Sequence, residues 1–106
     1  MMRRFDVFRN PSPRSRRDVP YLLLLQSELL DALPTQVVAP LVKPAALGGR
    51  PAARLNPSFQ VEGQPVFLLT QQLGAVRTTA LSNCVGSLAH ERAVIVEALD
   101  LLFSGI

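Results

Sequence analysis

The chain ends with Leu88-Ala89-His90-Glu91-Arg92-Ala93-Val94-Ile95-Val96-Glu97-Ala98-Leu99-Asp100-Leu101-Leu102-Phe103-Ser104-Gly105-Ile106. Apolar side chains recur here with the period of an α-helix and polar ones keep to one stripe, so residues 88–106 are predicted to form a terminal helix and tail. Ser87 is the expected N-cap, and Gly105 suits the turn that ends a helix. A helix that is apolar over most of its circumference must be covered on more than one side. Its apolar end, Phe103 and Ile106, must either fold back onto the body or contact a partner.

The length and composition of the chain limit the class of protein it can be. The chain has 106 residues, of which 48% are hydrophobic and 18% charged. This composition predicts one folded domain, residues 1–106, and excludes a disordered chain. The lone Cys84 excludes an intrachain disulfide framework, and we expect it to be a small buried or loop residue. The longest apolar run, residues 19–25, is too short for a membrane helix, and no signal peptide is recognisable, so we expect a soluble, cytoplasmic protein.

The first two thirds of the chain predict a mainly β fold. Apolar, β-branched and aromatic runs indicate strands at residues 5–8, 18–26, 36–42, 57–61, 65–70 and 77–81. Helix is the alternative for residues 18–26, because leucine is a good helix former. Residues 43–54 predict an irregular crossover, residues 71–76 are ambiguous, and residues 82–87 lead into the helix. Together they describe a small, strongly bent antiparallel sheet or partly open barrel with the terminal helix packed on it.

Positive charge is concentrated near the start. The net charge is +3, and six of the eleven basic residues precede position 18. Residues 9–17 contain Asn10-Pro11-Ser12-Pro13 and are expected to form a long, mobile hairpin loop. Its arginines form either a solvated loop or a surface for an acidic partner. No aromatic residue lies among them for base stacking, so an acidic protein segment is as good a candidate as nucleic acid.

The connection at residues 27–35 carries three leucines that a plain loop does not need: Leu29, Leu30 and Leu33. We expect most of them to fold back onto the core. The alternative is an exposed contact patch.

The sequence contains no recognisable catalytic constellation. His90 is the only histidine and has no partners at metal-ligand spacing. Gly48-Gly49 is not followed by the lysine and serine of a phosphate-binding loop. No pair of carboxylates is placed for acid–base chemistry by its spacing. We therefore expect a protein that acts by binding, with no enzymatic activity, metal or cofactor.

Three parts of the chain resemble the CcdB family of bacterial toxins, the gyrase-poisoning half of a toxin–antitoxin module. The first is Tyr21-Leu22-Leu23-Leu24-Leu25-Gln26-Ser27-Glu28-Leu29-Leu30-Asp31 followed by Val37-Val38-Ala39-Pro40-Leu41. The second is Leu55-Asn56-Pro57 with residues 59–63 and Leu68-Leu69-Thr70. The third is residues 88–106, which run in step with the terminal helix of the family down to the closing Gly-Ile.

The resemblance implies a small SH3-like barrel with a C-terminal helix, assembled as a two-fold homodimer. It implies that the paired tails enter DNA gyrase between its two A subunits and trap the enzyme on cleaved DNA, without chemistry by the toxin. No direct nucleic-acid or membrane binding is implied. The gyrase-binding positions carried over are Leu29, Leu30, Asp100, Phe103, Ser104, Gly105 and Ile106.

Two positions of the tail depart from the family pattern. Ser104 stands where the family has a tryptophan, a residue type that often dominates an interface, and Asp100 replaces a neutral amide. A weakened or non-toxic relative that still binds the antitoxin is therefore one alternative. An endoribonuclease toxin of the same barrel fold is another.

The resemblance also implies an antitoxin whose disordered, acidic C-terminal segment wraps the dimer. We expect Arg9, Arg14, Arg16 and Arg17 to help capture that segment.

Overall fold

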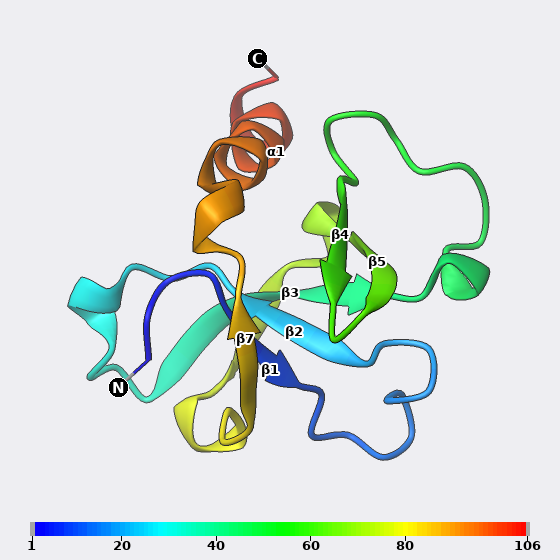
Figure 1. Cartoon of the computed structure of the whole chain (residues 1–106). Helices are drawn as coiled ribbons and strands as arrows, with labels where there is room; N and C mark the ends of the chain where they lie inside the picture. Colours follow the sequence, from blue (N-terminus) through cyan, green and yellow to red (C-terminus); the bar gives the residue numbers. More distant parts are fainter. Residues whose placement is uncertain (1, 106) are drawn as a thin grey trace.

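The computed structural model describes residues 2–105, and its strands join in one curled antiparallel sheet (Figure 1). The strands are β1 (Asp6–Arg9), β2 (Tyr21–Leu24), β3 (Thr35–Val42), β4 (Ser58–Val61), β5 (Gln64–Leu68), β6 (Gly74–Arg77) and β7 (Cys84–Ser87). They follow the order β4-β5-β3-β2-β1-β7. β3 is long enough to pair with β6 at its start and with β5 at its end. The predicted mainly β, partly open barrel with one terminal helix is confirmed.

Both faces of the central strands are buried, which explains the unbroken leucine run of β2. Leu23 belongs to the main core, whereas its neighbour Leu24 belongs to a smaller cluster on the other face. This is the alternation expected of successive residues in a strand. The predicted strand at residues 18–26 is therefore confirmed over the helix alternative, although only Tyr21–Leu24 form it.

The terminal helix α1 spans Arg92–Ser104 and rises from the same side of the sheet as the β4–β5 hairpin (Figure 1). Ile95, which is fully buried, anchors α1 in the main core. The prediction that α1 starts directly after Ser87 is wrong. Leu88 is buried and donates its backbone N–H to the carbonyl oxygen of Phe5 (2.8 Å), which holds residue 88 outside helical geometry.

The segment between β7 and α1 forms a 3₁₀ turn, η5 (Ala89–Glu91). The Ser87 hydroxyl accepts the backbone N–H of Ala89 (3.1 Å) at the entrance to this turn, so Ser87 is not the N-cap of the α-helix, a position that Glu91 holds. The predicted role of Gly105 at the other end is confirmed. It has φ +73°, and its N–H donates to the carbonyl oxygen of Leu101 (3.0 Å).

Two predictions about the strands around residue 80 are wrong. The strand predicted at residues 77–81 does not form, because Arg77 ends β6 and Thr78 donates its backbone N–H to Pro34 (2.8 Å) and its hydroxyl to Leu33 (2.7 Å), which bends the chain into η4 (Thr78–Ala80). β7 lies where a connection was expected and pairs with β1. Three further 3₁₀ turns are η1 (Glu28–Leu30), η2 (Pro44–Ala46) and η3 (Thr70–Gln72).

Within residues 2–105, no helix has the length and apolar character needed to cross a membrane.

Candidate functional site: the helix end and two flanking surfaces

The end of α1 presents an apolar side chain to solvent. Ile95 and Ala98 are fully buried, whereas Phe103 is 71% exposed. At about 100° of rotation per residue, Phe103 lies roughly 80° round the helix from Ile95 and within about 40° of Val96 and Leu99, which are partly buried against the main core. Phe103 is exposed because the end of α1 projects beyond the sheet (Figure 1). Of the predicted tail residues, Ser104 and Gly105 are also exposed, and Ile106 lies outside the described residues.

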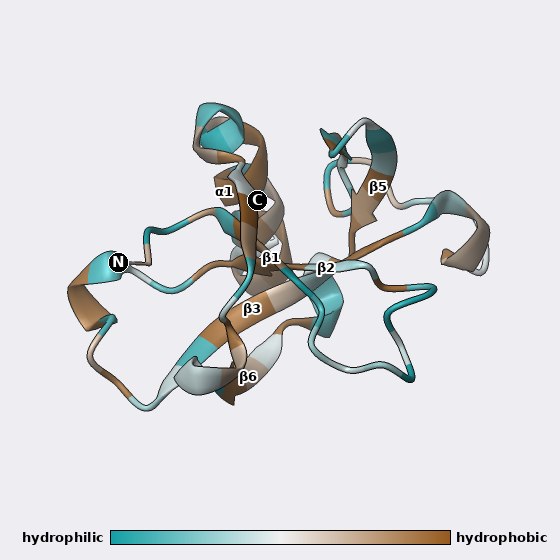
Figure 2. Ribbon diagram, turned by 60° about the horizontal axis from the view of Figure 1, so that its bottom comes forward, coloured by the Kyte–Doolittle hydropathy of each residue, from teal (hydrophilic) through white to brown (hydrophobic). Residues whose placement is uncertain are grey.

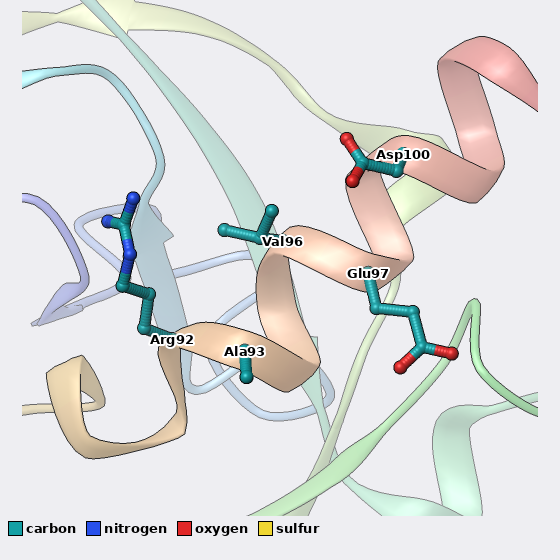
Figure 3. A pocket seen from close by; sticks show the side chains of 5 residues that line it. All are labelled: Arg92, Ala93, Val96, Glu97 and Asp100. Carbon is teal, nitrogen blue, oxygen red and sulfur yellow. The ribbon is translucent and has the colours of Figure 1, made fainter. Parts of the chain in front are cut away.

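Asp100 lies on a shallow depression along α1 with a volume of about 320 Å³. Figure 3 shows two adjacent lines of side chains there, Arg92-Val96-Asp100 and Ala93-Glu97. Glu97 accepts a hydrogen bond from Nε of Arg54 (2.6 Å), which ties the irregular residues before β4 to the helix. Asp100 itself is exposed. The helix thus carries an acidic side chain within one turn of Phe103.

The expectation that most of the connecting leucines fold back onto the core is wrong. Leu29 is 90% exposed, and Leu30 and Leu33 are about half exposed. Gln26 explains why. Its side chain donates to the carbonyl oxygens of Leu30 (3.2 Å) and Thr35 (3.1 Å) and accepts the N–H of Val37 (3.0 Å). The polar backbone of this connection is thereby turned inward and its leucines outward.

The tail and the η1 leucines do not meet within one protomer. In Figure 1, η1 lies at one side of the sheet and the end of α1 projects from its top. Figure 2 shows that much of α1 is hydrophobic. Val94, for example, is 39% exposed. Two separate apolar surfaces are thus available to partners.

The arginine loop, residues 9–17, is organised around Asn10. The buried Asn10 side chain donates to the Ser15 hydroxyl (2.9 Å) and the Val19 carbonyl oxygen (2.8 Å), and accepts the N–H of Ser12 (3.0 Å). Arg16 donates Nε to the Asn10 carbonyl oxygen (2.9 Å).

The four predicted arginines consequently differ in their freedom to bind a partner. Arg9 pairs with Glu62 at 3.2 Å, and Arg16 hydrogen-bonds within the loop. Arg14 and Arg17 are exposed and form no ion pair with another described residue.

A second group of basic side chains gave no signal in the sequence. Arg3, Arg4 and Arg92 line one depression together with Leu29. Arg3 and Arg4 precede β1 and Arg92 begins α1, so no spacing in the sequence signals their proximity. The pairing of β1 with β7 brings them together, and that pairing was not predicted.

The expectation for Cys84 is also wrong. It is an exposed strand residue at the start of β7, and its thiol lies 3.4 Å from the carbonyl oxygen of Gly86. Within residues 2–105, no three His, Cys, Asp or Glu residues are grouped to hold a metal ion.

Comparison with known proteins decides the family. The family model described as CcdB protein matches residues 4–105. The chain belongs to the CcdB family. A fold comparison finds a crystal structure of an Mtb toxin, which superposes with a TM-score of 0.66 at 18% identity over 78% of this chain and 91% of the other. A search of curated proteins found no significant match.

Membership of the CcdB family supports a role as the toxin of a toxin–antitoxin module. Because the Mtb toxin is only 18% identical to this CcdB chain, the similarity supports the fold and nothing about function. The target of the chain is therefore inferred from its exposed surfaces.

Proposed function

We propose that this CcdB chain binds the A subunit of DNA gyrase through the end of α1 and stabilises gyrase on cleaved DNA. The exposure of Phe103 carries the proposal, because a large aromatic side chain held in water by a well-anchored helix is typical of an interface anchor. Phe103 lies two residues before the left-handed Gly105, which fixes where the helix ends. The toxin acts by binding one state of gyrase and performs no chemistry itself.

We also propose that the chain forms a homodimer. Val94 and Leu101 lie about 20° apart on α1. Val94 is exposed and Leu101 partly so, and a second copy would cover them. Two tails would then project as one symmetric wedge. Sedimentation equilibrium should give a dimer for the wild type and a monomer for Val94→Glu.

Binding of an acidic antitoxin segment is the other proposed interaction. Arg14 and Arg17 are its main candidates in the arginine loop, since Arg9 and Arg16 already hydrogen-bond within the chain. The η1 leucines, above all Leu29, are proposed to add apolar contact to the gyrase surface.

The test compares wild type with Ser104→Trp in a DNA cleavage assay with purified gyrase. Ser104 is exposed, so the larger side chain should leave the fold intact. Restoring the aromatic residue of the family should lower the concentration needed for cleavage by about 30-fold or more, the scale of an interface hot spot. Ser82→Trp, at an exposed position before β7, is the matched control and should behave as wild type.

The outcomes separate the proposed function from the weakened relative. Cleavage complexes formed by both wild type and Ser104→Trp support a gyrase poison. Cleavage by Ser104→Trp alone supports a relative that has lost affinity for gyrase while keeping its antitoxin surface. Absence of cleavage with every variant, from protein that still binds its antitoxin, contradicts gyrase targeting.

A further inference from the structure

Three arginines outside the proposed gyrase and antitoxin surfaces line a depression of about 710 Å³. We call it the arginine depression and define it by Arg3, Arg4 and Arg92. Its lining also contains the acidic residues Asp6 and Glu28 and the apolar residues Phe5 and Leu29. The depression thus joins cationic, acidic and apolar groups in one concave surface.

Two of the arginines share one aromatic ring. The guanidinium carbon of Arg4 lies 4.7 Å from the centroid of the Phe5 ring, and that of Arg92 lies 5.8 Å from it. The ring is held firmly, because Phe5 is 2% exposed and its backbone N–H and C=O bond to Leu24 and Leu88. Phe5 also has φ +74°, which bulky side chains rarely adopt. The fold therefore keeps Phe5 in a strained backbone conformation, in which its ring contacts the guanidinium groups of both Arg4 and Arg92.

No acidic side chain among residues 2–105 forms an ion pair with either arginine. The ion pairs formed among residues 2–105 are Arg9–Glu62 and Arg54–Glu97, so neither Arg4 nor Arg92 has a carboxylate partner there. The pKa of Arg4 lies below its ordinary value, first because of burial and second because of the positive charge of Arg92. Two like charges are thus held together in an open depression. An anion from outside the chain would relieve their repulsion.

Arg4 is oriented for such an anion. Its Nε donates to the Leu25 carbonyl oxygen (2.8 Å), which fixes the guanidinium plane and leaves the two terminal nitrogens free within the described part of the chain. A planar fork of this kind suits the two oxygens of a carboxylate or a phosphate. Arg92 is exposed and forms no side-chain hydrogen bond with residues 2–105.

We propose that the arginine depression binds a carboxylate side chain of an acidic peptide segment, with a neighbouring apolar residue of that peptide packed on Leu29. The surroundings favour a peptide over nucleic acid. Asp6 and Glu28 in the lining would repel a continuous phosphate backbone. Phe5 is buried beneath the arginines and offers no face for a base. The site shares Leu29 with the proposed gyrase surface but goes beyond the proposed function, since its arginines require neither gyrase nor the arginine loop.

The test measures fluorescence anisotropy of a labelled peptide that carries one glutamate beside a leucine, added to the full chain. Arg92→Gln should raise the Kd about tenfold, the loss of one charge-assisted hydrogen-bonded pair. Arg4→Lys keeps the charge but loses the fork and should also weaken binding measurably. The matched control is Arg77→Gln, at an exposed arginine on β6, which should bind as wild type. Because Arg92 is exposed, Arg92→Gln should melt at the wild-type temperature.

Further arms distinguish this site from the alternatives. A peptide with glutamine in place of glutamate should bind at least tenfold more weakly, which supports carboxylate recognition. Equal Kd values for wild type, Arg92→Gln and Arg4→Lys would overturn the proposal. So would binding lost only in an Arg14→Glu/Arg17→Glu variant, which assigns the peptide to the arginine loop. Tighter, Arg92-dependent binding of a single-stranded DNA oligonucleotide would assign the depression to nucleic acid.

Discussion

The hydroxyl of Tyr21 donates a hydrogen bond of 2.6 Å to Oε1 of Glu62 and so joins β2 to the turn of the β4–β5 hairpin. Gln64 Nε2 donates to the same hydroxyl at 3.0 Å. Arg9, at the start of the arginine loop, lies 3.2 Å from Oε2 of Glu62. One small network thus fixes the hairpin above the strands from which the arginine loop leaves.

This network predicts an alkaline loss of stability. The pKa of Tyr21 is raised, first by burial and then by Glu62, which accepts a hydrogen bond only from the protonated hydroxyl. The stabilisation is therefore fully present below the unfolded pKa of about 10 and is lost as the pH rises through that value toward the folded pKa. Tyr21 is the only tyrosine and the chain has no tryptophan, so ultraviolet absorbance reports this group alone. The native midpoint should lie above that of protein unfolded in guanidinium.

Tyr21→Phe is the control for this titration. It keeps the ring, which belongs to a residue only 1% exposed, and removes the hydroxyl. We expect it to lower the free energy of unfolding by about 1 kcal/mol at neutral pH, the typical worth of one hydrogen bond. The difference in free energy of unfolding between the wild type and Tyr21→Phe should disappear in alkaline solution. Coincident native and unfolded midpoints would contradict the Tyr21–Glu62 bond.

Two substitutions on α1 should separate stability from function. Ile95→Ala removes a fully buried side chain and should lower the free energy of unfolding by about 2–5 kcal/mol. Phe103→Ala removes a side chain that is 71% exposed, so its melting curve should match wild type. Gyrase-dependent DNA cleavage should nevertheless be lost with Phe103→Ala. A large stability loss in Phe103→Ala would show that Phe103 packs inside its own protomer or dimer.

The sequence predicted those elements whose own residues determine them. The unbroken leucines of β2, the hairpin turn around Gly63 and the left-handed Gly105 are local signals, and each is found. The predicted start of α1 was wrong because a long-range hydrogen bond from the Leu88 N–H to the Phe5 carbonyl oxygen determines where the helix begins. β7 was missed because Gly86 and Ser87 have no strand preference of their own and pair only through β1.

The same distinction applies to the candidate surfaces. Phe103 could be singled out from its position at the end of an apolar helix, but the sequence left open whether it folds back or stays exposed, and the structure leaves it exposed. Hydropathy favoured burial for most of the connecting leucines, because it cannot show that Gln26 turns them outward; only the family resemblance placed Leu29 on a contact surface. The arginine depression could not be found at all, since Arg4 and Arg92 meet only when β1 and β7 pair.

The ion pair between Arg54 and Glu97 should contribute little to stability despite its short distance of 2.6 Å. Both side chains are about half exposed, so water and salt screen the attraction. Glu97→Gln should therefore change the free energy of unfolding by less than about 0.5 kcal/mol. Denaturant titration at low and high salt measures this. A loss well above 1 kcal/mol would show that the pair holds the irregular residues before β4 against α1.

Charge reversal in the arginine loop should weaken antitoxin binding without disturbing the fold. Arg14→Glu/Arg17→Glu changes two exposed side chains that form no ion pair among residues 2–105. If they attract an acidic segment, the Kd of the antitoxin complex should rise about tenfold or more, and its dependence on salt concentration should become shallower. Calorimetric titrations at several salt concentrations measure both quantities.

The control must change the net charge equally, because a less basic protein attracts any acidic partner less. Arg50→Glu/Arg77→Glu does so at two exposed arginines outside the loop and should keep most of the affinity. Arg16→Glu is a separate case. Arg16 holds the carbonyl oxygens of Asn10 (2.9 Å) and Pro11 (3.2 Å), so its loss should also loosen the loop and speed amide hydrogen exchange there. If the loop and control variants lose affinity equally, the arginines of residues 9–17 act only through net charge and form no specific antitoxin site.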